Sequence, residues 1–219
     1  MRHALSPVIF GLMVTAAVAE CPTTLADASH GVFVDFDGYV VRYDRRADGA
    51  VEELEFDSAD GTGYRYISQH GILVLESWEM QFGALMDGTH EIITYDVPLP
   101  ASISPNMTYA STTTVQYGSD APFTEPLRIM AGAPQTQVIG NCTMNVLEVQ
   151  MHTGAPGVEY VSNFIYFTAL GFGVFVGGGD LGAPPDMYPA TYIGTVPPTY
   201  GADGAPASVA PAAPAQATK

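Results

Sequence analysis

Residues 142–178 constrain the fold of this chain more than any other segment, because they have the pattern of three successive antiparallel β-strands. β-branched and aromatic residues are dense in this segment, and two groups of turn-forming residues divide it. The apolar face of the first strand changes sides between Val146 and Leu147, which predicts a β-bulge or a sharp coil there. The next strand, 160–167, is apolar on both faces. We therefore expect it to be covered on both sides or to line a cavity.

Similar short strands recur from residue 32 onward, and no segment has a sustained helical period. The sequence therefore predicts an all-β fold: an antiparallel meander of about eleven short strands that forms a sandwich, a barrel or a half-barrel. Residues 64–75 and 164–175 share a pattern of aromatic, hydroxyl and glycine positions. Two copies of a three-stranded unit would explain this pattern, and so would chance similarity between two meanders.

Residues 1–19 have the features of a signal peptide. Arg2 and His3 precede an apolar run, and residues 17–19 form a small-x-small cleavage site. We expect the mature chain to begin at Glu20 and to be exported, to the periplasm or the extracellular space. The apolar run is too short to span a membrane comfortably, and no later run is long enough for a transmembrane helix.

The composition changes near residue 182, which predicts a β domain over residues 20–182 and a tail over 183–219. The tail is rich in proline and alanine and has few charged residues. Such a segment buries too little apolar surface to become ordered, so we expect disorder. The alternative is that the first part of the tail lies over the sheet, through Tyr188, Tyr192, Ile193 and Tyr200.

The chain has two cysteines, Cys21 and Cys142. In an exported protein they most simply form one structural disulfide, which here would close a loop of about 120 residues. Two free thiols or a metal-binding pair are the alternatives.

The chain is strongly acidic, with 23 acidic residues, seven Lys and Arg residues and a formal net charge of −16. This charge repels nucleic acids and anionic lipid surfaces, and it favours cationic partners or divalent ions. The only lysine is the last residue, Lys219. Phosphate-loop hydrolases and pyridoxal enzymes are therefore excluded, and we expect no cofactor.

The histidines do not have the spacing of a metal site. His70, His90 and His152 are far apart in the sequence, and Met151 and His152 are strand neighbours that point to opposite faces. The acidic residues from Asp35 onward resemble part of a calcium loop but lack its final glutamate, and hairpin turns explain them equally well. The sequence predicts no metal ligands.

No catalytic residue is predicted either. The chain has no Gly-x-Ser-x-Gly motif, although a triad defined only by geometry stays open. Glu53 and Glu55 share one face of a strand and could in principle serve glycoside hydrolysis. Because we expect charged partners around them, a solvated face is the favoured interpretation.

One resemblance to known proteins rests on residues 146–176, in which a strand, a turn, an aromatic strand, Leu170-Gly171 and an apolar strand follow one another. This layout resembles uncharacterised exported β proteins of Gram-negative bacteria, and more faintly the lipoprotein-carrier half-barrels. The resemblance implies a curved antiparallel sheet around an apolar groove. The helices that plug the groove in those carriers are not predicted here, and no functional residue is carried over.

These observations favour a non-enzymatic exported β domain that binds a hydrophobic or amphiphilic ligand in an aromatic groove. The residues expected to line the groove are Tyr160, Phe164, Tyr166, Phe172 and Val174. A structural or protein-interaction module of the cell envelope is the alternative, and a hydrolase with a site not visible in the sequence is the third possibility.

Overall fold

The structure is a computed structural model that describes residues 21–26, 31–36, 39–56, 61–200 and 206–207. The expected signal peptide and residues 208–219 lie outside these ranges. All regular structure in the described ranges is β-strand. The strands are β1 Val32–Asp35, β2 Val40–Arg45, β3 Val51–Phe56, β4 Thr62–Gln69, β5 Leu73–Gln81, β6 Ala84–Leu85, β7 Glu91–Tyr95, β8 Thr108–Tyr117, β9 Phe123–Ile139, β10 Cys142–Thr153, β11 Tyr160–Phe167, β12 Phe172–Asp180, β13 Asp186–Met187, β14 Tyr192–Gly194, β15 Thr199–Tyr200 and β16 Pro206–Ala207.

Fourteen of these strands form one sheet in the order β13-β12-β11-β10-β9-β8-β7-β5-β4-β3-β2-β1-β14, with β6 paired to β5. All the pairings are antiparallel, and β15 pairs separately with β16. The sheet follows chain order almost throughout, which confirms the predicted all-β meander. It is open, because β13 and β14 lie at its two ends.

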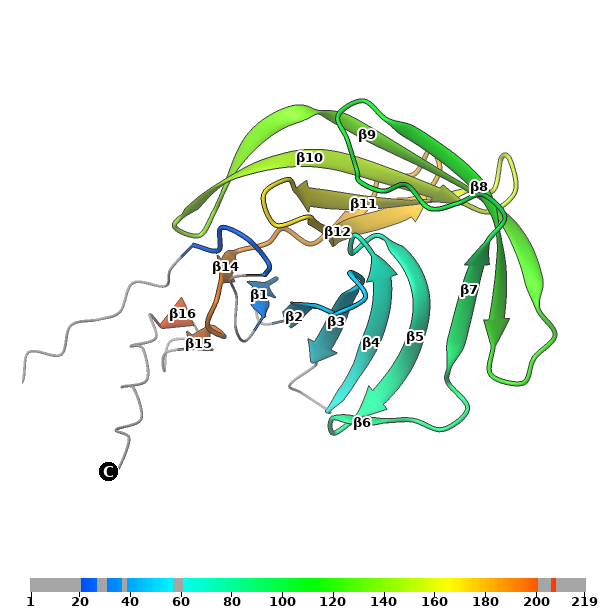
Figure 1. The fold of residues 1–219 in the computed structure, drawn as a ribbon, viewed down its shortest axis with the longest axis horizontal. Coiled ribbons are helices and arrows are strands. Elements are labelled where there is room, and N and C mark those ends of the chain that lie inside the picture. The colour runs from blue at the N-terminus through cyan, green and yellow to red at the C-terminus, as the bar shows by residue number, and fades with distance from the viewer. Residues whose placement is uncertain (1–20, 27–30, 37–38, 57–60, 201–205, 208–219) are drawn as a thin grey trace, which may run out of the picture.

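The sheet curls so that its two halves lie over one another. Figure 1 shows β9 to β12 crossing the upper part of the molecule, above β1 to β4. Apolar residues of β1, β2 and β3 pack there against those of β10, β11 and β12 and form the first core. The Tyr43 ring, for example, stacks on Phe172 with the ring centroids 4.7 Å apart. This contact joins residues that are far apart in the chain.

A second core lies on the opposite face of β10. Val146 is buried in the first core, whereas Leu147 is buried in the second. The pairing register between β10 and β9 is regular between Val146 and Leu147, where the sequence predicted a bulge or a coil, and shifts between Leu147 and Val149, with the extra residue on β9. Strand β11 contributes Phe167 to the first core and Phe164 to the second. The expectation that β11 is covered on both faces is therefore confirmed.

The two segments that share a sequence pattern form hairpins, β4–β5 and β11–β12, and the hairpins meet. The Gly173 amide donates a hydrogen bond to the His70 carbonyl oxygen at 2.8 Å. A Cβ at Gly71 would lie 2.5 Å from the Gly173 carbonyl oxygen, so only glycine allows this approach. The contact holds the β4–β5 hairpin against β12. Whether the two segments are copies of one unit stays a prediction.

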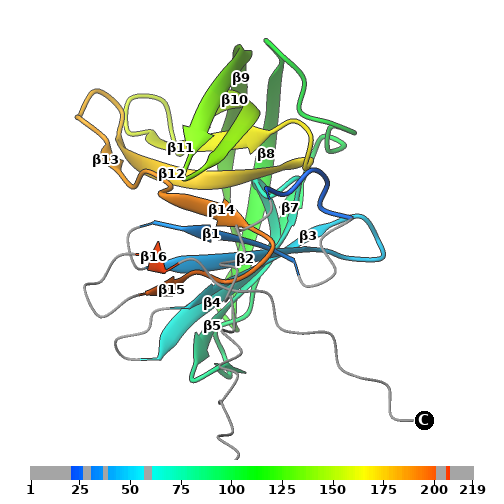
Figure 2. The ribbon, with the colours of Figure 1, turned by 90° about the vertical axis from the view of Figure 1, so that its left-hand side faces the viewer.

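The domain does not end at residue 182, where the sequence analysis placed its boundary. β13 pairs with β12, and β14 pairs with β1, as Figure 2 shows. Ile193 is only 2 % exposed and belongs to the first core, in agreement with the alternative that part of the tail lies over the sheet. The average composition of residues 183–219 concealed the short apolar group around Ile193. The edge of β1 that does not face β2 pairs with this group. The disorder expected for residues 208–219 stays a prediction.

Truncation after residue 182 is expected to destabilise the protein. It removes the strand that covers β1 and the buried Ile193 side chain, and deleting such a side chain typically costs about 3 kcal/mol. Thermal melting of the two chains measures the loss. A control truncation that removes residues 208–219 keeps every strand and should melt like the full-length chain. Equal melting temperatures for all three chains would show that β14 contributes nothing to stability.

Candidate functional site

A groove runs between β2, β3 and β4 on one side and β11 and β12 on the other. It consists of two cavities of about 320 and 280 Å³ that share Glu53, Glu55 and Phe175 in their walls. We call it the β3 groove. Its walls are mostly apolar and rich in aromatic rings, which come from Phe36, Tyr39, Tyr43, Tyr66, Phe164, Phe175 and Tyr188.

Strand pairing places tyrosines on both sides of one carboxylate. Tyr43 on β2 and Tyr66 on β4 both lie directly opposite Glu53 on β3. Residues opposite one another in a sheet point to the same face, so the three side chains form a row across the groove wall. Glu55, two residues further along β3, points to the same face.

Both carboxylates accept hydrogen bonds from tyrosine hydroxyls. Tyr43 lies in β2, and Tyr39 is the residue immediately before β2. The Tyr43 hydroxyl donates to Glu53 Oε1 at 3.1 Å, and the Tyr39 hydroxyl donates to Glu55. Tyr43 is fully buried, Glu53 is 9 % exposed, and Glu55 is half-buried. The hydroxyl protons therefore point toward the carboxylates, and the oxygens that remain available in the groove are hydrogen-bond acceptors.

The apolar surroundings change the acid–base behaviour of this row. Burial raises the pKa of Glu53 well above its ordinary value, and the nearby charge of Glu55 raises it further. Burial also raises the pKa of Glu55, against the effect of its bond from Tyr39. The pKa values of Tyr39, Tyr43 and Tyr66 are raised as well, chiefly by burial. The tyrosines are therefore neutral donors at physiological pH.

The expectation that Glu53 and Glu55 lie on a solvated face is wrong. Their cross-strand partners on the groove face are Tyr43, Tyr66 and Val41. The charged side chains expected around them lie on the other face of the sheet, where Arg42, Asp44, Glu52 and Arg65 form ion pairs. The alternation of β2 shows an apolar face in the sequence. Matching that face to the glutamates of β3 requires the register, which the sequence does not reveal.

The five residues predicted to line one groove are divided between the two cores and the surface. They are Tyr160, Phe164, Tyr166, Phe172 and Val174, and only Phe164 lines the β3 groove. Phe172 and Val174 are fully buried in the first core, Tyr166 is buried in the second, and Tyr160 is 43 % exposed. On β12 the groove residue is Phe175, which points to the face opposite Val174.

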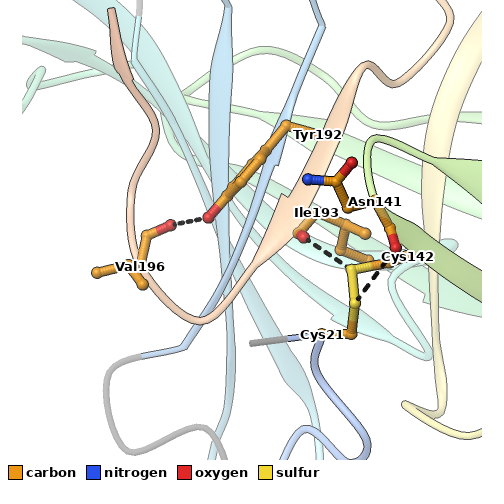
Figure 3. Close-up of a disulfide and its surroundings, with 6 residues drawn as sticks. All are labelled: Cys21, Asn141, Cys142, Tyr192, Ile193 and Val196. Atoms are coloured by element: carbon orange, nitrogen blue, oxygen red, sulfur yellow. Dashed lines mark hydrogen bonds between the residues drawn. A yellow bond between two sulfur atoms is a disulfide. The ribbon is translucent and has the colours of Figure 1, made fainter. Parts of the chain in front are cut away.

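The structure contains the Cys21–Cys142 disulfide, shown in Figure 3, and neither cysteine is free. It ties residues 21–26 to the start of β10. Cys142 Sγ lies 3.6 Å from the Ile193 carbonyl oxygen, so the bridge also adjoins β14. The disulfide therefore joins the N-terminal segment to the first core, away from the β3 groove.

The candidate metal ligands of the sequence lie in separate places. His90 stacks on Trp78 and contacts Glu76, His152 contacts Glu159, and His70 contacts the Pro100 carbonyl oxygen. Within the described ranges, no three His, Cys, Asp or Glu side chains gather as a metal site would require. Nor does any helix in the described part of the chain have the length and apolarity to cross a membrane.

Comparison with protein-family models, with curated proteins and with solved structures finds no match to this chain. The resemblance to exported β proteins and half-barrel carriers stays a prediction.

Proposed function

We propose that this protein is a non-enzymatic exported binding protein that holds a small amphiphilic ligand in the β3 groove. The observation that carries the proposal is the composition of the groove: a wall of aromatic rings with two carboxylates at its centre. Small-molecule sites are concave and mostly apolar, with a few polar groups that fix the orientation of the ligand. The apolar part of the ligand would contact the rings, and its polar end would lie at Glu53 and Glu55.

The position of the groove in the fold supports the same proposal. Its walls come from paired strands near the two ends of one large sheet, and the β4–β5 hairpin is held against β12 by the bond between His70 and Gly173. A site built on paired strands is pre-formed, which lowers the cost of ordering it when a ligand binds. The ring centroids of Tyr188 and Phe175 are 6.3 Å apart. Tyr188 is 52 % exposed and lies at the open side of the groove.

Export to the periplasm or the extracellular space is part of this proposal. A disulfide is typical of oxidising compartments, and residues 1–19 have the pattern of a signal peptide. An exported protein meets ligands that come from outside the cell or from its envelope, which suits a binding role.

A neutral dye that fluoresces in apolar surroundings, such as Nile red, tests the groove. We expect the wild-type protein to bind it, and Phe175→Ala to weaken binding about tenfold, because Phe175 belongs to both cavities and aromatic anchors dominate binding energies. Fluorescence titration measures both affinities.

Phe123→Ala is the matched control. Phe123 is also a strand phenylalanine, but it is 55 % exposed on β9 and does not line the groove. We expect this variant to bind the dye like the wild type. If the dye does not bind, or if Phe175→Ala binds it as well as the control does, the proposed site is wrong.

A further inference from the structure

We infer that the polar end of the ligand is an organic cation, an ammonium group whose apolar substituents lie in the β3 groove. This inference rests on the proposed function and specifies the chemistry of the ligand. It follows from three features of the groove: carboxylates without a counter-charge among the described residues, the oxygen acceptors that they present, and aromatic rings beside them.

The first feature is that no described residue supplies a positive charge to the groove carboxylates. Every arginine in the described ranges has its polar partner elsewhere; these contacts are Arg42 with Asp44, Arg45 with Gly49, Arg46 with Asp48, Arg65 with Glu52 and Arg128 with Glu159. No described residue that lines the groove is Lys, Arg or His. Burying a carboxylate without a counter-charge is costly, and a bound cation would relieve that cost.

The second feature is the direction of the hydrogen bonds. The hydroxyls of Tyr43 and Tyr39 already donate to Glu53 and Glu55. The carboxylate oxygens that remain offer acceptors to a ligand. An anionic head group, such as a carboxylate or a phosphate, would find no positive charge among the described lining residues and would be repelled by the ionised glutamates.

The third feature is the set of tyrosine rings beside the carboxylates. Tyr66 flanks Glu53 across the strands, and Tyr39 lies against Glu55, whereas the buried Tyr43 ring is stacked on Phe172. Aromatic faces attract cations, and aromatic cages are the usual recognition device for quaternary ammonium groups. Carboxylates and rings together thus match an alkylammonium, and the net charge of −16 adds a field that attracts cations.

Three amphiphiles with the same eight-carbon chain test the inference: octylammonium, 1-octanol and octanoate. Calorimetric titration of the mature protein measures each affinity. We expect the ammonium to bind about tenfold more tightly than 1-octanol, a factor that pairing with one desolvated carboxylate already provides, and octanoate to bind most weakly. Glu53→Gln should reduce the affinity for the ammonium to that for 1-octanol, and leave the affinity for 1-octanol unchanged.

Glu52→Gln is the matched control. It removes the same charge from the next residue of the same strand, on the opposite face of the sheet, where Glu52 pairs with Arg65 at 2.6 Å. We expect it to bind all three compounds like the wild type. If Glu53→Gln does not fold, Glu55→Gln replaces it, since Glu55 also belongs to both cavities.

Each contrary outcome has a distinct meaning. Equal affinities for the three compounds would overturn the cation inference and leave the proposed groove intact. Equal weakening of ammonium binding by Glu52→Gln and Glu53→Gln would also overturn it, because the attraction would then come from net charge. Failure of all three compounds to bind would overturn the proposed function together with the inference.

Discussion

Replacement of both cysteines by serine is expected to lower the free energy of unfolding by about 5 kcal/mol. Cys21 and Cys142 are 121 residues apart in the sequence, and in the chain-entropy model a cross-link over that separation restricts the unfolded chain by this amount. For a domain of this size the loss corresponds to a melting temperature lower by about 10 °C or more. The effect is large because the bridge closes a long loop in the unfolded chain.

Denaturant unfolding of three samples tests this expectation: the oxidised wild type, the reduced wild type and the C21S/C142S variant. The reduced wild type and the variant should unfold at the same, lower denaturant concentration. The double substitution leaves no free thiol, so thiol exchange does not complicate the comparison. An unfolding midpoint that does not change on reduction would show that the bridge does not stabilise the fold.

Glu53→Gln is expected to raise the free energy of unfolding at pH 7 by about 1 kcal/mol or more. Burial raises the pKa of Glu53, so ionisation of this carboxyl costs more in the folded state than in the unfolded chain. One pKa unit corresponds to about 1.4 kcal/mol. Glutamine keeps an oxygen that accepts the bond from Tyr43 but carries no charge, and so avoids the cost.

The gain should depend on pH in a defined direction. A raised folded pKa means that the contribution of Glu53 to stability is fully present below its ordinary value of 4.5 and is lost as the pH rises through the raised pKa. The difference between Glu53→Gln and the wild type should therefore be small near pH 4 and grow toward pH 8. Denaturant unfolding across this range measures it.

Glu52→Gln gives the opposite sign and serves as the control. It breaks the ion pair with Arg65 on the other face of β3, which should cost at most about 1 kcal/mol at pH 7. A Glu53→Gln variant that is less stable than the wild type at pH 7 would show that the carboxylate is structural. The expected result, a more stable variant with weaker ammonium binding, is typical of a residue whose role is binding.

Local patterns in the sequence were sufficient for the strands and for much of the core. The change of apolar phase between Val146 and Leu147 is the point at which β10 passes from one core to the other, although the sequence predicted only a bulge or a coil there. The doubly apolar pattern of β11 predicted cover on both faces or a cavity. Both features depend on side-chain alternation within one strand. The disulfide followed from the number of cysteines and the expected compartment.

The candidate site could not be predicted in the same way, because it depends on which strands pair and in which register. Glu53 and Glu55 look like the polar face of an amphipathic strand until the register sets them opposite Val41, Tyr43 and Tyr66. The return of β14 to the edge of β1 likewise joins segments about 160 residues apart. Long-range pairing of this kind leaves no mark on local periodicity.

Native mass spectrometry of the mature protein, released without denaturation from cells that make it, tests the central claim most directly. The account predicts a non-covalent additional mass that disappears on denaturation and is reduced in Phe175→Ala but not in Phe123→Ala. A wild-type protein with only the mass of its own chain, less two hydrogens for the disulfide, would contradict a ligand-binding groove.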